Sequence, residues 1–357
     1  MHGSLTVKRS IPIQPIEIQR ASSEDQTAWD RFADVSPSAT FFHRHAWADV
    51  IRECFGHRPE YLLARRGGQM AGILPLMHKS SPLFGQALIS TPFLSYGGVA
   101  TDDPAIRQAL ESHAVQLAEE LGVQYLELRN RGQRRDAGHS PATQYATFLK
   151  DIPQDMEQII RSIPAKGRRH DLKRSLRQDL VFEAPGRLKD LYEILAESFR
   201  NLGTPIFPRR YFDKILTAFP RETEVCTVKK DGRPISAALV FSFRDHVQPF
   251  YAGGRRSARD LHANDFLFLN IMLRARVRGY AAFDFGRSKV GSGAYAYKSH
   301  WGFEAEPLAY EYRLIRGTHL PDISPQNPRY KHMIALWQRL PLVIANVLGP
   351  RISGHFG

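Results

Sequence analysis

Residues 225–241 read VCTVKKDGRPISAALVF, in which two apolar runs flank the dipeptide Asp231-Gly232. An Asp-Gly pair between two such runs is typical of a β-hairpin, because both residues tolerate the positive φ angles of a tight hairpin turn. Residues 61–77, YLLARRGGQMAGILPLM, repeat the pattern around Gly67-Gly68, and basic residues precede the turn in both stretches. The sequence therefore predicts a similar hairpin in each half of the chain.

The similarity of the two halves continues downstream of each hairpin. Residues 103–129 predict an amphipathic helix that ends at Gly122 and leads into a strand, and the second half repeats this order around Gly279. The two turns are 164 residues apart and the two glycines 157 residues apart, so the duplication of one α/β unit explains the pattern. In the second helix, Asn264 or Asp265 is expected to cap the N-terminus.

The composition is that of a globular protein with two domains. The chain has 357 residues, 43% of them hydrophobic, which is enough to build two cores. The first residues, MHGSLTVKRSIPIQP, lack the apolar run of a secretory signal peptide, and no stretch approaches the roughly 18 apolar residues of a membrane span. We therefore expect a cytoplasmic protein. Cys54 and Cys226 are expected to be buried, without a disulfide or a thiolate metal site.

The charge of the chain is strongly basic. A net charge of +13 and a pI near 9.8 favour a polyanionic partner, such as phosphate, a nucleotide, tRNA or an anionic lipid surface. A basic surface that only keeps the protein soluble is the alternative. Residues 163–180 predict a helix that starts near Pro164 and has one cationic face, which is either solvated or binds an anion. The cations on this face are Lys166, Arg169, Lys173 and Arg177.

Residues 330–357 form an apolar C-terminal segment that polar residues and Pro341 interrupt. The segment is too short and too interrupted to span a bilayer. We expect a pair of helices that docks on the core; a contact with a membrane surface is the alternative.

Residues 283–304, FDFGRSKVGSGAYAYKSHWGFE, concentrate glycines, cations and aromatic side chains. They predict a strand, a Gly-rich turn and a short helix that exposes Lys298. Such a turn can direct backbone N–H groups and the side chains of Arg287 and Lys289 toward an anion, and Asp284 is a candidate proton acceptor. This arrangement suits acyl transfer to an amine, and a purely structural turn is the alternative. The aromatic residues expected in the core are Phe283, Phe285 and Trp301.

The sequence contains no motif of several other classes of enzyme. In residues 286–293, GRSKVGSG, the lysine lies between the glycines, so the stretch is not a phosphate-binding loop of the ATPase type. The chain contains neither HExxH nor GxSxG, and its histidines, His43, His45 and His57 among them, show no metal-ligand spacing. We therefore expect no metal.

Taken together, these features make the sequence similar to those of one known family. The pair of α/β units and residues 283–314, FDFGRSKVGSGAYAYKSHWGFEAEPLAYEYRL, are similar to the FemAB-like proteins, which are tandem transferases of GNAT (acyl-CoA N-acyltransferase-like) fold. They resemble in particular the FemAB-related protein associated with the exosortase/PEP-CTERM system of Gram-negative bacteria. Residues 43–64, 81–98, 201–212 and 337–357 resemble the same subfamily, so the resemblance covers nearly the whole chain.

The resemblance implies an α/β (α+β) fold of two tandem GNAT-like domains, each a mixed, largely antiparallel sheet flanked by helices. We expect the N-terminal domain at residues 1–150 and the C-terminal domain at residues 151–315. Residues 316–357 are expected to form a helical segment that packs back on both domains.

The resemblance also implies a function. The family transfers an acyl or aminoacyl group to an amine of a cell-envelope or exopolysaccharide precursor, with nucleotide- or lipid-linked peptidoglycan precursors as acceptors in one branch. Lys298 matches a lysine associated with the acceptor site, and Asp284, Gly286 and Gly293 match positions that form it. The residues expected to bind substrate are Arg287, Lys289, Gly291, Gly293, Tyr295, Arg168 and Arg169. The residues expected to bind the donor are Tyr251, Arg255 and Arg256.

Two departures from the family leave the donor open between acyl-CoA and aminoacyl-tRNA. No heptad pattern indicates the helical arm that many tRNA-dependent members carry. Residues 253–265, GGRRSARDLHAND, lack the [QR]xxGx[GA] pattern of a pyrophosphate loop. An acyl-CoA-dependent N-acetyltransferase and a non-catalytic module that binds an anionic polymer are the alternatives. The expected partners are the envelope precursor, tRNA and the inner-membrane surface, but not DNA.

Overall fold

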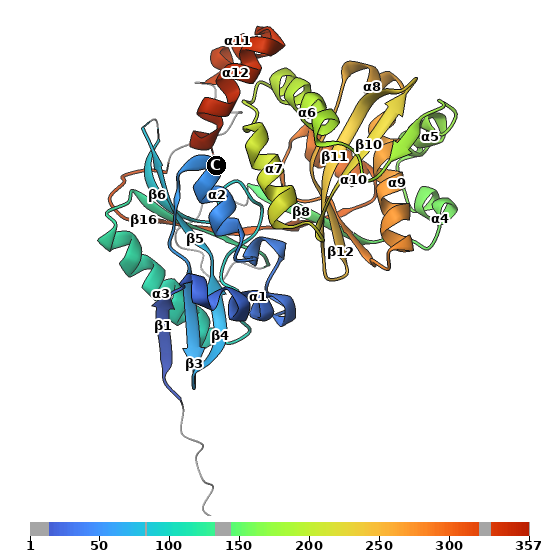
Figure 1. Cartoon of the computed structure of the whole chain (residues 1–357). Coiled ribbons are helices and arrows are strands. Elements are labelled where there is room, and N and C mark those ends of the chain that lie inside the picture. The colour runs from blue at the N-terminus through green and yellow to red at the C-terminus, as the bar shows by residue number, and fades with distance from the viewer. Residues whose placement is uncertain (1–13, 83, 133–143, 321–329, 357) are drawn as a thin grey trace, which may run out of the picture.

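The computed structural model describes residues 14–82, 84–132, 144–320 and 330–356 of the chain. Figure 1 shows two α/β units side by side, with a pair of C-terminal helices at one end of the molecule. Each unit contains mixed or antiparallel sheets flanked by helices. The predicted fold class is thereby confirmed.

The first unit contains two sheets. A three-stranded antiparallel sheet has the order β1-β3-β4, and a five-stranded mixed sheet has the order β16-β7-β6-β5-β2. The strands are β1 (Ile16–Arg20), β2 (Arg58–Pro59), β3 (Leu62–Arg66), β4 (Gln69–Leu74), β5 (Leu76–Ser81), β6 (Gly85–Ser90), β7 (Tyr125–Asn130) and β16 (Ala309–Leu314). The helices are α1 (Gln26–Val35), α2 (Trp47–Phe55) and α3 (Pro104–Glu120), with short 3-10 turns η1 (Ser23–Asp25) and η2 (Phe41–His43).

The second unit contains one eight-stranded sheet of order β14-β8-β13-β12-β11-β10-β9, with β15 also paired to β8. Its strands are β8 (Tyr145–Asp151), β9 (Val181–Glu183), β10 (Thr223–Lys230), β11 (Arg233–Phe243), β12 (His246–Gly254), β13 (Ala282–Asp284), β14 (Ser288–Lys289) and β15 (Glu304–Pro307). Its helices are α4 (Met156–Arg161), α5 (Lys166–Ser175), α6 (Leu188–Leu202), α7 (Arg209–Ala218), α8 (Arg256–Asp260), α9 (Ala263–Val277) and α10 (Gly293–His300). The chain continues into α11 (Lys331–Arg339), α12 (Leu342–Ile352) and the turn η4 (Ser353–Phe356).

Both predicted hairpins are present. β3 pairs with β4 and β10 pairs with β11, and Asp231 and Gly232 adopt φ angles of 51° and 74° at the second turn. Gly122 and Gly279, which follow α3 and α9, also have positive φ. The predicted cap is wrong, because His262 occupies the N-cap position of α9 and makes no side-chain capping bond.

The two units exchange strands. β8 pairs with β13, β14 and β15 of the second sheet, and β16 returns to pair with β7 of the first. Both exchanges therefore cross the predicted boundary near residue 150. This boundary and the one near residue 315 remain predictions. Because each sheet needs a strand from the other side of a boundary, neither unit completes its sheet alone.

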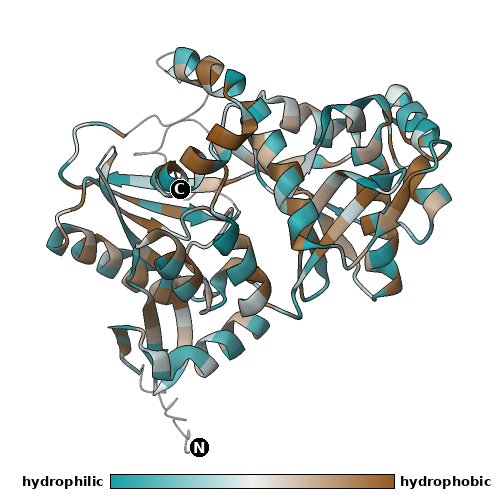
Figure 2. Ribbon diagram, turned by 45° about the horizontal axis from the view of Figure 1, so that its top comes forward, coloured by the Kyte–Doolittle hydropathy of each residue, from teal (hydrophilic) through white to brown (hydrophobic). Residues whose placement is uncertain are grey.

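A single aromatic-rich core also joins the units. It contains buried residues of the first unit and of the second in one contact cluster, and Figure 2 shows hydrophobic residues running along the strands and the inner sides of the helices. Large members of this cluster are Trp29, Phe42 and Trp47 of the first unit and Phe219, Phe241 and Tyr251 of the second. Cys54 and Cys226 are buried and free, and Phe283, Phe285 and Trp301 are buried, as predicted.

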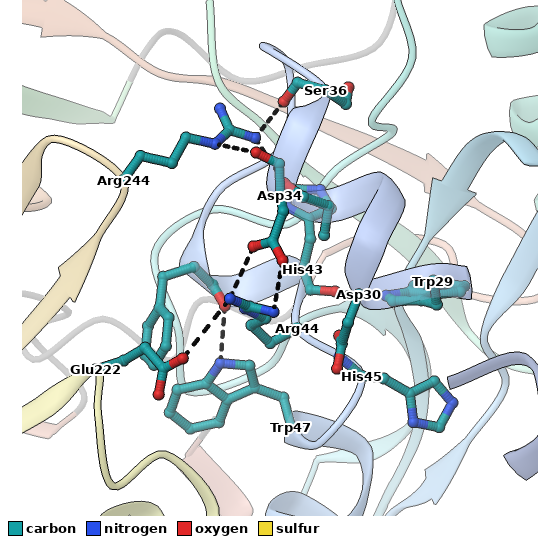
Figure 3. A network of polar contacts seen from close by, with 12 residues as sticks. Trp29, Asp30, Asp34, Ser36, His43, Arg44, His45, Trp47, Glu222 and Arg244 are labelled. Carbon is teal, nitrogen blue, oxygen red and sulfur yellow. Dashed lines mark hydrogen bonds and ion pairs between the residues drawn. The ribbon is translucent and has the colours of Figure 1, made fainter. Parts of the chain in front are cut away.

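A network of polar contacts at the edge of this core connects the two units (Figure 3). Arg244, in the turn between β11 and β12, donates to the backbone oxygens of Asp34, at 3.0 Å, and of Ser36. The side chain of Asp34 lies 2.8 Å from Arg44, which also lies 3.6 Å from Glu222. Arg244 thus neutralises the negative end of α1 with a cation from the second unit.

Candidate active site

The candidate site lies where β12 and β13 diverge. The two strands are parallel neighbours through only two residue pairs, His246 with Ala282 and Val247 with Phe283. Beyond these pairs the strands line opposite walls of a cavity of about 520 Å³. Its walls are formed by Pro249, Phe250, Tyr251, Ala252 and Gly253 of β12, Phe285, Gly286, Arg287 and Ser288 after β13, Asn264 and Phe268 of α9, Ala294, Tyr297 and Lys298 of α10, and Phe93, Ser95 and Phe207.

Lys298 reaches into this cavity from α10. Its ammonium group donates to the carbonyl oxygens of Gly286, at 2.8 Å, and Arg287, at 3.2 Å. Burial lowers the pKa of Lys298 to about 7, although the charge of Asp284 acts to raise it. The prediction that the short helix exposes Lys298 is wrong, because α10 lies against the sheet and turns this side chain toward the turn after β13.

Asp284 lies behind that turn. Its carboxylate, 5% exposed, accepts hydrogen bonds from Tyr96, Thr147 and Gln248 and from the backbone N–H of Gly286, the last at 2.7 Å. It lines a separate cavity of about 100 Å³ and is absent from the lining of the larger one. Asp284 therefore fixes Gly286, whose carbonyl receives Lys298.

Arg287 carries an unpaired positive charge on the cavity wall. Its guanidinium donates to the hydroxyl of Tyr310 at 3.1 Å and lies over the ring of Tyr145, at 4.8 Å. Among the described residues no carboxylate forms an ion pair with it, and the buried hydroxyl of neighbouring Ser288 has no hydrogen-bond partner there. A cation in such a place is costly unless an anion accompanies it.

The other residues predicted after β13 shape the turn and line neither wall of the cavity. Gly291 adopts a φ of 76°, and Gly293 begins α10 under the cap of Ser292. Lys289 belongs to β14, where it pairs with Tyr145. The ring of Tyr295 packs edge-on against Phe148, with centroids 5.1 Å apart.

Arg168 supports the site from outside the cavity. Its guanidinium lies 2.9 Å from Asp265 and over the ring of Tyr297, at 4.5 Å. Asp265, 2% exposed, also accepts from the Tyr297 hydroxyl and from the indole N–H of Trp301. Arg168 thus ties α5 to α9 and α10, while Arg169 is partly exposed on α5, away from the lining.

Of the three predicted donor-binding residues, Tyr251 lines the cavity and shares a hydrogen bond with Tyr211 at 3.2 Å. Arg255 is engaged by the carbonyl of Pro234 and by Glu197, each at 3.0 Å. Arg256 is exposed at the first position of α8. Neither arginine lines the cavity.

Sequence reasoning missed the aromatic wall. Phe93 and Phe207, with ring centroids 5.8 Å apart, come from opposite units and meet at the cavity. Phe250 and Phe268 add further rings. An aromatic residue in a loop carries no local signal of this kind, since its neighbours become known only with the fold. In the described part of the chain, no three His, Cys, Asp or Glu side chains are grouped to hold a metal.

Comparisons with known proteins agree with the fold. Residues 165–299 match the family model of the acetyltransferase (GNAT) domain. No curated protein matches the chain. Among solved structures, FemX superposes with a TM-score of 0.64 at 14% identity, over 89% of this chain and 100% of that chain.

Two further structures are similar. A tandem GNAT protein from the clavulanic acid biosynthesis pathway has a TM-score of 0.52 at 14% identity, over 85% of this chain and 100% of that chain. L-PGS from Bacillus licheniformis has a TM-score of 0.51 at 12% identity, over 92% and 98%. The chain therefore shares its fold with FemX and with a tandem GNAT protein, and its residues 165–299 match the GNAT acetyltransferase domain family.

Proposed function

We propose that the protein is a GNAT-type transferase that passes an acyl or aminoacyl group from an activated donor to an amine. The observation that carries the proposal is Lys298, with its pKa near 7, in the cavity between the diverging strands β12 and β13. The matched segment, residues 165–299, contains both strands, α9 and most of α10. The donor is acyl-CoA or aminoacyl-tRNA.

The donor would lie along β12. After the bulge between β11 and β12, the strand turns Tyr251 and the backbone around Ala252 toward the cavity. Asn264, in the first turn of α9, lines the same wall, and the N-terminal end of a helix favours the phosphates of either donor. The aromatic rings of Phe250 and Phe268 would cover the acyl group.

Lys298 would carry the proton of the reaction. The amine nitrogen attacks the carbonyl carbon of the donor, a C–N bond forms, and the C–S bond of a thioester or the C–O bond of an aminoacyl ester breaks. With a pKa near 7, Lys298 is partly neutral at neutral pH and can take the proton from the amine and return it to the leaving sulfur or oxygen. The proposed role of Asp284 as proton acceptor stays open beside this one, although four donors already occupy its carboxylate.

The acceptor would carry an anionic group. Arg287 has no carboxylate partner in the described part of the chain, and Ser288 has a spare hydroxyl next to it. A phosphate or carboxylate of a nucleotide- or lipid-linked envelope or exopolysaccharide precursor supplies such a charge. The resemblance to the FemAB-related protein of the exosortase/PEP-CTERM system supports this class of acceptor.

The proposal is tested with Lys298→Ala. Transfer of label would be measured from acetyl-CoA and from bulk aminoacyl-tRNA to an extract of lipid- and nucleotide-linked envelope precursors. Loss of a group that moves the proton should lower kcat by about 100-fold or more. Lys189→Ala, which removes a lysine that is 69% exposed on α6, serves as the matched control and should transfer normally. A Lys298→Ala enzyme that keeps the melting temperature and the turnover of the parent would refute the proposal.

A further inference from the structure

The C-terminal helix pair presents its apolar side to the solvent. On α12, Val343, Ile344, Val347 and Leu348 are 76%, 44%, 50% and 41% exposed. At about 100° per residue, these four positions form one continuous face. On α11, Met333 and Leu336 are 62% and 66% exposed, and Figure 2 shows hydrophobic colour over this pair of helices.

The fully buried residues on the side of α12 that packs on the protein are small, and Leu342 packs there partly buried. Ala345 and Gly349 are its buried positions. A Cβ atom on Gly349 would lie 3.1 Å from the backbone nitrogen of Ile206, so the helix approaches as closely as a glycine permits. Ordinary surface helices bury their large aliphatic residues and expose their polar ones. α12 instead leaves four aliphatic residues exposed, and this face has no partner inside the described protein.

The charged residues of this C-terminal segment have one sign. Residues 330–356 contain Lys331, Arg339 and Arg351 and no Asp or Glu. Arg351 is exposed and falls within the arc of the four aliphatic residues of α12. An aliphatic face with interspersed cations matches the boundary between the acyl chains and the anionic headgroups of a bilayer. In the described ranges no helix is long and apolar enough to cross a bilayer, so the contact would be with its surface.

We propose that α11 and α12 dock the protein on an anionic lipid bilayer, with Val343, Ile344, Val347 and Leu348 inserted among the acyl chains. A second copy of the chain suits the same face less well. A twofold contact through this face would bring Lys331, Arg339 and Arg351 of both copies together, and no carboxylate in the segment would offset their repulsion.

The packed side of α12, opposite the docking face, lies next to the cavity wall. Ile206, which α12 contacts, precedes Phe207 of the wall, and Gly354 contacts Phe55, whose ring stacks on Phe93 with centroids 4.2 Å apart. If the proposed function holds, a bilayer under α12 would place a lipid-linked acceptor within reach of the cavity. This second step rests on the proposed transferase activity, whereas the docking itself does not.

The docking is tested by co-sedimentation of the full chain with phosphatidylcholine vesicles, with and without phosphatidylglycerol. We expect the parent protein to bind the phosphatidylglycerol vesicles. The double variant Val343→Ser/Val347→Ser should bind them with an affinity at least about tenfold lower. The matched control is Val35→Ser/Val277→Ser, which changes two valines that are 73% and 88% exposed on α1 and α9; it should bind as the parent does.

The double variant Arg339→Gln/Arg351→Gln tests the contribution of the cations to docking. It should show a smaller preference for phosphatidylglycerol vesicles, and its binding should depend less on salt. The proposal would be overturned by a parent protein that binds neither vesicle, or by serine variants that bind as tightly as the parent. Sedimentation equilibrium supplies a third outcome: a dimer that Val343→Ser/Val347→Ser dissociates would assign the face to a second copy. Lys298→Ala should bind vesicles normally, so failure of docking and failure of the transferase are told apart.

Discussion

At the scale of single residues, His43 connects two separate loops through its ring. The imidazole is 2% exposed; its Nε2–H donates to the carbonyl of Gly98 at 2.9 Å, and its Nδ1 accepts the backbone N–H of Thr40 at 3.0 Å. Protonation would place a hydrogen on Nδ1, where it would face that N–H. Burial accordingly lowers the pKa of His43 to about 4.

This low pKa predicts acid sensitivity. The unfolded chain takes up a proton at His43 as pH falls below about 6.5, whereas the folded protein does not until about pH 4, so stability is lost over that window. The loss from this one group is about 3 kcal/mol. In urea unfolding at pH 7 and pH 5, His43→Gln should lose less stability than the parent between the two values. The exposed His332→Gln on α11 should follow the parent, and parallel curves for all three proteins would contradict the assignment.

Single residues were predictable where their role is local. The sequence singled out Lys298, Arg287 and Asp284, and the structure brings all three to the turn after β13. It did not predict that Lys298 is partly buried and donates to the carbonyls of the turn. It expected Asp265 as a helix cap, whereas Arg168, Tyr297 and Trp301 hold its carboxylate from distant parts of the chain, which no local pattern encodes.

At the scale of elements, the turn between β13 and β14 decides where Lys298 points. Gly286 has a φ of 70°, and a Cβ there would lie 3.2 Å from the side-chain nitrogen of Gln248. Gly291, further along, has a φ of 76° with nothing within 4 Å. Both glycines have a positive φ, but only Gly286 contacts the residues around Asp284.

The pair gives a matched comparison. Gly286→Ala and Gly291→Ala should each cost about 1–2 kcal/mol of stability from the left-handed backbone. Only Gly286→Ala should also displace Gln248, disturb the carbonyls that hold Lys298 and lower transfer activity. Urea unfolding and the transfer assay measure the two effects separately. Equal activity of the two variants would show that this turn does not position Lys298.

Among elements, the hairpins and the helices α3 and α9 were predictable, because apolar period and turn residues are local signals. The exchange of β8 and β16 between the sheets was not. Pairing between strands far apart in the sequence depends on which sheet edges remain unpaired in the folded protein. The short parallel contact between β12 and β13, which opens the cavity, depends on the same pairing.

At the scale of the whole molecule, the sequence predicted a duplicated unit, a tandem fold and site residues in the second unit, but not that the first unit contributes to the cavity wall. The second unit provides both diverging strands, and the first contributes Phe93 and Ser95 to the wall. The shared aromatic core and the contacts of Arg244 hold these walls together. A ligand that fills the cavity would therefore contact both units and stabilise them together.

The most direct test of the account is the melting temperature of the protein with acetyl-CoA, a longer acyl-CoA, bulk aminoacyl-tRNA and nucleotide-sugar precursors. A ligand of the native state at about 100 times its Kd adds about 2.7 kcal/mol of stability. The account predicts a shift with an acyl-CoA or with aminoacyl-tRNA, and a smaller shift in Phe268→Ala, which opens the aromatic wall. No shift with either donor, or one that Phe268→Ala leaves unchanged, would contradict the assignment of the cavity to the donor.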